Sequence, residues 1–263
     1  MKSLIDLYGL QGFGNILIET VASDSRYEIS RYITRREEYP NPYWKQNNLL
    51  HLINEFGCNP IFVEQKSEIP YFPVSPYAIV SSFHKIFPPA LLNRYKLVVN
   101  IHPSYLPQYR GPTPTRRMIL DNCELGGVTA HVMTSDIDAG PIISQMKINI
   151  SKCTDGETRR RIAEASRLVI VDVLNFLTQQ YNLDSLPIPI EGETHKRVLP
   201  EDHQICANMT IEKASLILRA FSPFPGAIVN IDGWSEYRVS SPYRENFTET
   251  LPLSNGTLRV VRW

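Results

Sequence analysis

The chain has 263 residues, of which 43% are hydrophobic and 21% are charged. This composition supports a sizeable core and excludes an intrinsically disordered chain. Lys plus Arg and Asp plus Glu both number 27, so no excess positive field favours binding of nucleic acid. No apolar run approaches the ~18 residues of a membrane span, and the N-terminal apolar stretch is too short for a signal peptide. We therefore expect a cytoplasmic protein with no membrane partner and no nucleic-acid partner.

The four cysteines, Cys58, Cys123, Cys153 and Cys206, form no C-x-x-C pair. A structural zinc site is therefore not expected, and scattered reduced thiols are.

Strand-like and helix-like segments alternate over the first two thirds of the chain. The strand-like segments are residues 3–8, 27–33, 77–81, 97–99, 128–133 and 142–150. The helix-like segments are residues 15–22, 49–56 and 88–94, followed by a long helix that starts near Thr154, where Thr154 and Glu157 have capping-box spacing. This alternation predicts an α/β fold, an open, mostly parallel Rossmann-like sheet with flanking helices.

The pattern changes after the long helix. Residues 186–190 include two prolines and predict an extended connector. Residues 211–221 predict a helix that ends at the segment 222–226, and Asp232-Gly233 and Asn255-Gly256 predict turns between short strands. We therefore expect two parts, a catalytic domain over residues 1–183 and, over residues 184–263, a connector with a small C-terminal α+β subdomain.

Two polar residues stand at the end of the strand predicted around residues 97–99. Asn100 and His102 are two positions apart, so their side chains emerge on one face, and the carboxyl end of such a strand is where open α/β sheets bind ligands. An amide and an imidazole can both donate hydrogen bonds to the oxyanion that forms when an amine attacks a carbonyl. Taken alone, an N-x-H pair is more often a turn amide beside a packed histidine.

A polar loop after the strand at 128–133 holds Asp136 and Asp138. A carboxylate on such a loop suits proton transfer and would hold His102 as an imidazolium. Taken alone, Asp138 is more often a turn residue.

The two segments together are more specific. The pattern N-x-H-P-S-x-L-P-x-Y-R-G at 100–111, followed by G-x-T-x-H-x₆-D-x-G-x-I at 127–142, resembles the folate-dependent formyltransferase family. That family includes glycinamide ribonucleotide, methionyl-tRNA and sugar-nucleotide formyltransferases. The resemblance covers the first two thirds of the chain and implies Asn100, His102 and Asp138 as catalytic residues. Tyr105 departs from it, standing where a leucine is common.

The resemblance also implies a co-substrate, N10-formyltetrahydrofolate, and no metal. Its pterin pocket corresponds to residues 82–87 and the loop 134–138, where backbone groups pair with the pterin edge and apolar side chains flank the ring. The candidate folate-binding residues are Phe83, His84, Lys85, Ile86, Phe87, Thr134 and Asp136.

Candidate acceptor-binding residues come from several segments. The turn Gly9-x-x-Gly12-Phe13-Gly14 fails as a dinucleotide fingerprint and is similar to the first turn of the transfer-RNA and sugar-nucleotide branches. A charged and aromatic loop at 34–44 suits substrate contact or a solvated surface equally, and arginines of the C-terminal part suit phosphates or surface ion pairs. The candidates are Gly12, Phe13, Tyr43, Trp44, Arg110, Arg197, Arg219 and Phe224.

Chain length and net charge help to choose among the acceptor substrates of this family. The transfer-RNA enzyme carries a full C-terminal barrel and a basic insertion, whereas the purine enzyme ends soon after the long helix. A dTDP- or GDP-linked amino-deoxysugar fits best, with a product for surface polysaccharide (O-antigen) synthesis and a homodimeric enzyme. The alternatives are a methionyl-tRNA or glycinamide ribonucleotide formyltransferase, a formyl-folate hydrolase, which would carry H-H-S at 102–104, and an inactive folate or nucleotide binder.

Overall fold

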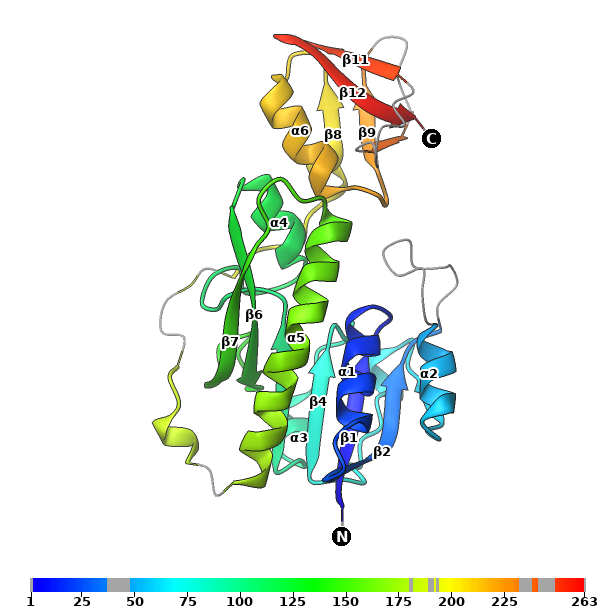
Figure 1. Cartoon of the computed structure of the whole chain (residues 1–263), viewed down its shortest axis with the longest axis vertical. Coiled ribbons are helices and arrows are strands. Elements are labelled where there is room, and N and C mark those ends of the chain that lie inside the picture. The colour runs from blue at the N-terminus through cyan, green and yellow to red at the C-terminus, as the bar shows by residue number, and fades with distance from the viewer. Residues whose placement is uncertain are drawn as a thin grey trace.

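The chain folds into two sheet-containing units stacked along the long axis of the molecule (Figure 1). The computed structural model describes residues 2–36, 48–179, 182–188, 192, 194–231, 238–240 and 249–262. Tyr43, Trp44 and the turn predicted at Asp232-Gly233 lie outside these residues.

A seven-stranded sheet forms the larger unit. Its strands are β1 (Ser3–Gly9), β2 (Tyr27–Thr34), β3 (Pro60–Phe62), β4 (Tyr77–Ser81), β5 (Leu97–His102), β6 (Leu125–Val132) and β7 (Ile142–Asn149). Their order is β3-β2-β1-β4-β5-β6-β7. Strands β1 to β5 run parallel, whereas β6 and β7 form an antiparallel extension. The predicted open, mostly parallel sheet is therefore confirmed.

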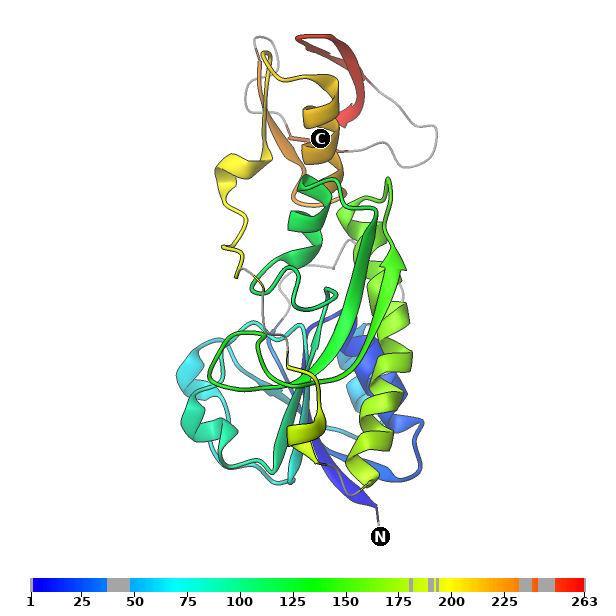
Figure 2. The same ribbon diagram turned by 90° about the vertical axis from the view of Figure 1, so that its left-hand side faces the viewer.

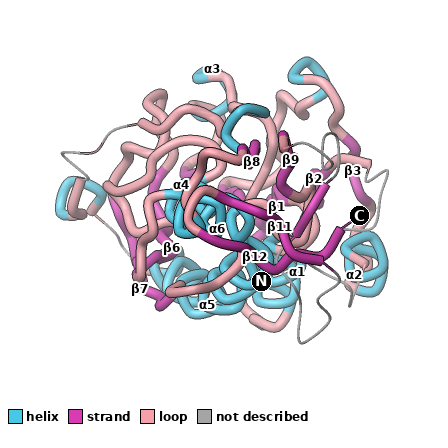
Figure 3. Tube along the Cα trace, turned by 90° about the horizontal axis from the view of Figure 1, so that it is seen from above, coloured by secondary structure: helices cyan, strands magenta, loops and turns pink. Residues whose placement is uncertain are grey.

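Helices cover both faces of this sheet. They are α1 (Phe13–Ala22), α2 (Leu49–Glu55), α3 (Pro89–Leu92), α4 (Pro114–Leu120) and α5 (Asp155–Thr178), with short 3₁₀ turns η1 (Lys66–Glu68) and η2 (Leu183–Ser185). Figure 3 shows α1 and α5 on one side of the strands and α3 on the other. Alternate residues of β1 serve the two faces: Leu7 enters the core under α1 and α5, and Tyr8 enters the core under α3.

The long helix α5 begins where the capping pattern predicts. Thr154 Oγ1 accepts a hydrogen bond from the Glu157 N–H at 3.3 Å, and Glu157 Oε2 accepts one from the Thr154 N–H at 2.8 Å. Reciprocal capping satisfies two amide groups that the first turn would otherwise leave unpaired. Ile162, Val169 and Val173 then line the buried face of the helix.

The smaller unit contains a five-stranded sheet of order β11-β12-β10-β9-β8 beside one helix (Figure 2). Its elements are η3 (Pro200–His203), β8 (Gln204–Cys206), α6 (Ile211–Ala220), β9 (Ala227–Asn230), β10 (Arg238–Ser240), β11 (Glu249–Leu253) and β12 (Gly256–Arg262). Leu253 pairs with Gly256 across the hairpin, so the turn lies at Ser254 and Asn255, one residue before the predicted Asn255-Gly256. The small α+β architecture is as predicted.

A buried carboxylate joins the two units. Asp155, at the start of α5, accepts hydrogen bonds from Thr115 Oγ1 at 2.6 Å and from Arg116 Nε at 3.2 Å. The Arg116 guanidinium also donates to the Phe224 carbonyl at 3.1 Å. Ile119 of α4 packs into the core of the smaller unit. The boundary at 183/184 stays a prediction, since the packing of α4 links the units on both sides of it.

Sequence periodicity missed the short strands β3 and β8 and the short helix α4. A three-residue strand and a seven-residue helix are too short for their apolar spacing to stand out. In the described part of the chain, no helix is long and apolar enough to cross a membrane.

Candidate active site

Asn100 and His102 lie at the carboxyl end of strand β5. Because they are two residues apart, their side chains share one face, while Val99 and Ile101 point into the core on the other. His102 is 4% exposed and Asn100 is half-buried. The strand therefore holds both side chains on a rigid element at the sheet edge where α/β proteins bind ligands.

Asp138 reaches this pair from the loop after β6. Its Oδ2 lies 3.5 Å from His102 Nδ1, and its Oδ1 accepts a hydrogen bond from Asn100 Nδ2 at 3.2 Å. Its backbone is left-handed, with φ of 48°. The loop then returns at Gly140, where a Cβ would lie 1.8 Å from the Val132 carbonyl oxygen, so only glycine fits. The three residues predicted to be catalytic thus meet in one cluster.

His131 is a fourth member of the cluster that sequence analysis left without a role. It lies opposite Asn100 across the antiparallel β5–β6 pair. Its Nε2 is 3.1 Å from Asn100 Nδ2 and 3.5 Å from Asp138 Oδ1, and its Nδ1 is 3.0 Å from the Val132 carbonyl oxygen. A carbonyl oxygen only accepts, so Nδ1 carries a proton. The histidine in the 127–142 pattern was a usable signal, but its facing of Asn100 follows only from the strand register.

Burial and charge act in opposite directions on the ionisation of the cluster. Burial lowers the pKa of His102 from its ordinary value of 6.5, and Asp138 and the Tyr109 carbonyl offset this only in part. The sequence-based expectation that Asp138 holds His102 as an imidazolium is thus not met at neutral pH, because desolvation wins. Burial would raise the pKa of Asp138, but His102, His131 and the Gly111 N–H outweigh it, so that pKa lies well below its usual range.

Residues 109–111 hold the cluster from outside. The Tyr109 carbonyl oxygen lies 2.9 Å from His102 Nε2, and the Gly111 N–H donates to Asp138 Oδ2 at 2.8 Å. The Arg110 guanidinium donates twice to the carbonyl of Ile137, at 2.8 and 3.0 Å. Its guanidinium thus holds the residue just before Asp138, and its predicted role in substrate binding stays a prediction.

The predicted pterin-pocket segment follows β4, next to β5 in the sheet. Phe83 and Phe87 pack edge-on against the Tyr8 ring, with centroids 5.4 and 4.7 Å away. Phe87 is buried, Lys85 is half-buried and Ile86 is 66% exposed. Phe83 and Met133 pack against the same core under α3, so this segment and the start of the loop after β6 lie near each other.

Unpartnered polar atoms collect in the same segment. Ser81 Oγ and both ring nitrogens of His84 are buried without a hydrogen-bond partner among the described residues. Burial lowers the pKa of His84, and the positive charges of Lys85 and Arg35 lower it further. The Val63 backbone raises this pKa slightly, but it lies outside hydrogen-bond geometry. A neutral imidazole at this position suits a polar, uncharged ligand edge.

The other candidate folate residues lie on the loop before Asp138. Thr134 and Asp136 are exposed, and Thr134 Oγ1 donates to the Asp136 carbonyl at 3.2 Å. This contact tightens the loop, and the two side chains do not touch the catalytic cluster within the described contacts.

The candidate acceptor residues are dispersed. The Gly12 N–H donates to Asn15 Oδ1 at 2.9 Å in the β1–α1 turn, and Phe13 is 3% exposed within the core. Arg219 donates to the Cys153 carbonyl at 3.4 Å and to Asn122 Oδ1 at 3.2 Å. These contacts give Phe13 and Arg219 structural partners, so their assignment to substrate stays a prediction.

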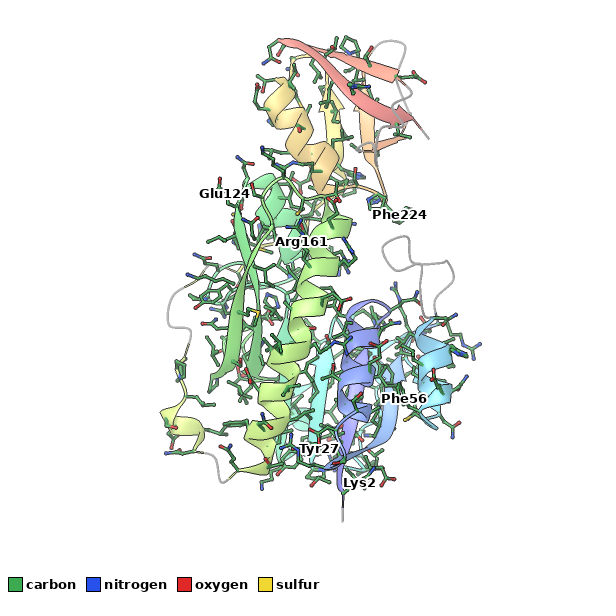
Figure 4. The ribbon with its side chains drawn as sticks, in the orientation of Figure 1. Lys2, Tyr27, Phe56, Glu124, Arg161 and Phe224 are labelled. Carbon is green, nitrogen blue, oxygen red and sulfur yellow. The ribbon has the colours of Figure 1, made fainter. Side chains whose placement is uncertain are left out.

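Two candidates are open to solvent. Arg197 is exposed in the connector. Phe224 is 49% exposed, and Figure 4 shows it at the edge of the smaller unit that faces the larger one. Within the described residues, no group of three or more His, Cys, Asp or Glu side chains could hold a metal ion.

Comparison with known proteins agrees with this geometry. Residues 64–174 match the family model described as formyl transferase. A methionyl-tRNA formyltransferase of Lactobacillus gasseri is 27% identical, over 89% of this chain and 76% of its own. The chain spans only about half the length of other methionyl-tRNA formyltransferases that it matches, 46% and 53% in two cases.

Solved structures share the fold over nearly the whole chain. A sugar N-formyltransferase from a Shewanella species has a TM-score of 0.67 at 18% identity, covering 92% of this chain and 99% of its own. HypX from Aquifex aeolicus in complex with tetrahydrofolic acid has a TM-score of 0.68 at 13% identity, covering 98% of this chain and 43% of its own. The residues that carry Asn100, His102 and Asp138 thus lie within the segment, 64–174, that matches the family model described as formyl transferase.

Proposed function

We propose that this protein transfers the formyl group of N10-formyltetrahydrofolate to the amino group of a nucleotide-linked amino-deoxysugar. The observation that carries the proposal is the cluster of Asn100, His102 and Asp138 at the carboxyl end of β5, in which a buried imidazole faces an ionised carboxylate at 3.5 Å. An amide and a base on one strand, with a carboxylate that a loop brings to them, are groups that suit acyl transfer to an amine.

The protonation states follow from the hydrogen bonds. The Tyr109 carbonyl accepts from His102 Nε2, so Nδ1 of the neutral ring is unprotonated and faces Asp138. As the acceptor nitrogen bonds to the formyl carbon, His102 Nδ1 takes up the proton that this nitrogen loses. The imidazolium then lies between the Tyr109 carbonyl and the Asp138 carboxylate, and the same proton is available to N10 as its bond to the formyl carbon breaks.

Asn100 serves the formyl oxygen. Its amide nitrogen donates to Asp138 and lies against His131, and the half-buried side chain lies beside the base. Exchanging the 3.2 Å bond to Asp138 for one to the formyl oxygen places a donor where negative charge develops. His102 and Asn100 thus divide proton transfer and oxyanion stabilisation between them.

The residues after β4 fit a folate. The folate supplies an activated one-carbon unit on N10. Ser81 Oγ and the His84 ring offer buried polar atoms that need partners, and the pterin ring is rich in complementary groups. Phe83 and Phe87 add the apolar wall that such pockets require. HypX, solved with tetrahydrofolic acid, shares the fold and supports the same donor here.

Two features support a sugar-nucleotide acceptor. The net charge of the chain is zero, whereas gripping a transfer RNA requires many basic contacts. Phe224 is an exposed aromatic ring on the side of the smaller unit that faces the sheet, suited to stacking on a base.

Methionyl-tRNA is the second candidate acceptor, favoured by the sequence relative from Lactobacillus gasseri, which covers most of this chain. The deciding experiment incubates the protein with formyl-folate and, separately, a panel of dTDP- and GDP-linked amino sugars, Met-tRNA and glycinamide ribonucleotide. Mass spectrometry detects the gain of about 28 Da that replacement of one N–H hydrogen by a formyl group gives. Formylation of an amino sugar alone supports the proposal; formylation of Met-tRNA alone overturns the acceptor and keeps the chemistry.

We further propose a cytoplasmic homodimer whose product enters surface polysaccharide. Edge strands of a small sheet need cover, and β11 lies at the edge of the five-stranded sheet. Light scattering that gives a monomer at micromolar concentration would overturn the dimer.

A further inference from the structure

The segment that connects the two units packs against residues 109–111, which contact the catalytic cluster. The linker segment, defined here as residue 192 together with residues 194–198, runs beside Arg110, with which Thr194 forms a parallel bridge. The His195 N–H donates to the Arg110 carbonyl at 2.9 Å, and the Arg110 guanidinium donates to the Gly192 carbonyl at 3.4 Å. Farther along, the Val198 N–H donates to Thr113 Oγ1 at 3.2 Å.

Side-chain packing reinforces these backbone contacts. The His195 imidazole stacks on the Tyr109 ring, with centroids 5.0 Å apart and an interplanar angle of 17°. The far end of the Tyr109 ring is fixed by a 2.8 Å contact between its hydroxyl and Cys123 Sγ. Tyr109 is therefore held at both its face and its tip.

Two glycines permit the close approach. A Cβ on Gly111 would lie 2.6 Å from the His195 carbonyl oxygen, and a Cβ on Gly192 would lie 2.2 Å from the Pro107 carbonyl oxygen. Both distances are shorter than any non-bonded carbon–oxygen contact, so an added side chain would push the two segments apart.

The same three residues that the linker segment holds also hold the cluster. Tyr109 provides the carbonyl on His102, Arg110 fixes the carbonyl before Asp138, and Gly111 provides the N–H on Asp138. Resting on the proposed function of this site, we propose that His195 is a positioning residue, which acts on His102 and Asp138 through residues 109–111. The linker segment is thus a working part of the active site as well as a tether.

The arrangement has a chemical consequence. The Tyr109 carbonyl keeps the proton of neutral His102 on Nε2, which leaves Nδ1 free to act as the base. If Tyr109 shifts, this preference is lost and the imidazole turns away from its productive geometry. A misplacement of about 1 Å costs up to ~10²-fold in rate while binding is retained.

The test compares His195→Ala with His195→Phe, which keeps an aromatic face for Tyr109. His203→Ala is the matched control, since His203 stacks on Phe221 in the smaller unit with centroids 4.8 Å apart. We expect His195→Ala to lower kcat about 10-fold or more with nearly unchanged KM values, and His195→Phe and His203→Ala to stay within about 3-fold of the original chain. Equal kcat in all variants would overturn the proposal.

A second measurement does not depend on knowing the substrate. Hydrogen exchange of the Gly111 amide, read by NMR, reports whether the bond to Asp138 is held. We expect faster exchange in His195→Ala and in Gly192→Ala, where the added methyl wedges the linker segment off Pro107, while His203→Ala keeps the original rate. Unchanged exchange in both variants would overturn the positioning role, whereas absence of formyl transfer by the original chain would overturn only the proposed function.

Discussion

His102 Nδ1 faces Asp138 Oδ2 at a distance of 3.5 Å, inside a site where the imidazole is almost fully buried. The carboxylate alone would raise the pKa of the histidine, yet burial lowers it further than the carboxylate raises it. The pair therefore rests as a neutral imidazole beside an ionised carboxylate, poised to take up a proton instead of already carrying one.

Removing the base should abolish most of the activity. We expect His102→Ala to lower kcat by about 10²-fold or more, since loss of a general base or of a key donor has this effect. The KM for formyl-folate should change little, because the interaction develops in the transition state. His51→Ala, at an exposed histidine whose side chain is 78% accessible, serves as the control. Near-normal turnover of His102→Ala would remove His102 from the mechanism.

The pH dependence of kcat should follow His102. Because burial lowers its pKa, the neutral base predominates above that pKa, and activity should fall on the acid side at a pH below 6.5, the ordinary histidine value. Asp138→Asn removes the charge that opposes desolvation, so the acid limb should move to still lower pH while kcat falls at every pH. A limb that moves upward, or stays in place, would contradict the pairing.

The same shifts make folding depend on pH. His102 and Asp138 both have pKa values lowered by the folded state, so the unfolded chain binds protons first as pH falls. Their contribution to stability should be complete above 6.5 for His102 and above 3.8 for Asp138, and should decline below those values. In urea unfolding, His102→Gln should lose less stability between pH 7 and pH 5 than the original chain. An identical pH dependence in both chains would contradict this account.

The Tyr8 ring should support the folate pocket. Tyr8 is fully buried, packs edge-on against Phe83 and Phe87, and its hydroxyl lies 2.9 Å from the Tyr95 hydroxyl. We expect Tyr8→Leu to raise the KM for folate about 3- to 10-fold, since each aromatic pair contributes ~0.5–1.5 kcal/mol. Tyr8→Phe keeps the ring and should leave that KM nearly unchanged. Equal KM values for folate in the two variants would show that the Tyr8 ring does not contribute to folate binding.

The carboxylate that joins the two units should matter for stability. Asp155 is fully buried between Thr115 and Arg116, and Asp155→Ala removes the acceptor that both side chains share. We expect a loss of ~3 kcal/mol in the free energy of unfolding, read from the urea midpoint. Asp172→Ala, at an exposed aspartate that accepts from Ser144 at 2.6 Å, should cost less than ~1 kcal/mol. Similar midpoints for the two variants would contradict a structural role for Asp155.

Local patterns in the sequence determined much of the fold. Apart from β3 and α4, the strands and helices up to α5 lie close to the predicted ranges, because each has apolar spacing of its own and, for α5, a complete capping box. The spacing of Asn100 and His102 on one strand placed both on the same face, and the pattern from 127 to 142 identified the loop that delivers Asp138. These are short-range consequences of backbone geometry, so the order of residues is sufficient to reveal them.

Only the tertiary structure decided how the site is held. His131 faces Asn100 through the register of two antiparallel strands, and His195 reaches Tyr109 across 86 positions of sequence, the difference of the two residue numbers. The lowered pKa of His102 likewise depends on burial, a property of the whole packed environment. Long-range pairing and desolvation have no local pattern in the chain, which explains why sequence analysis found the three central residues and missed the contacts that position them.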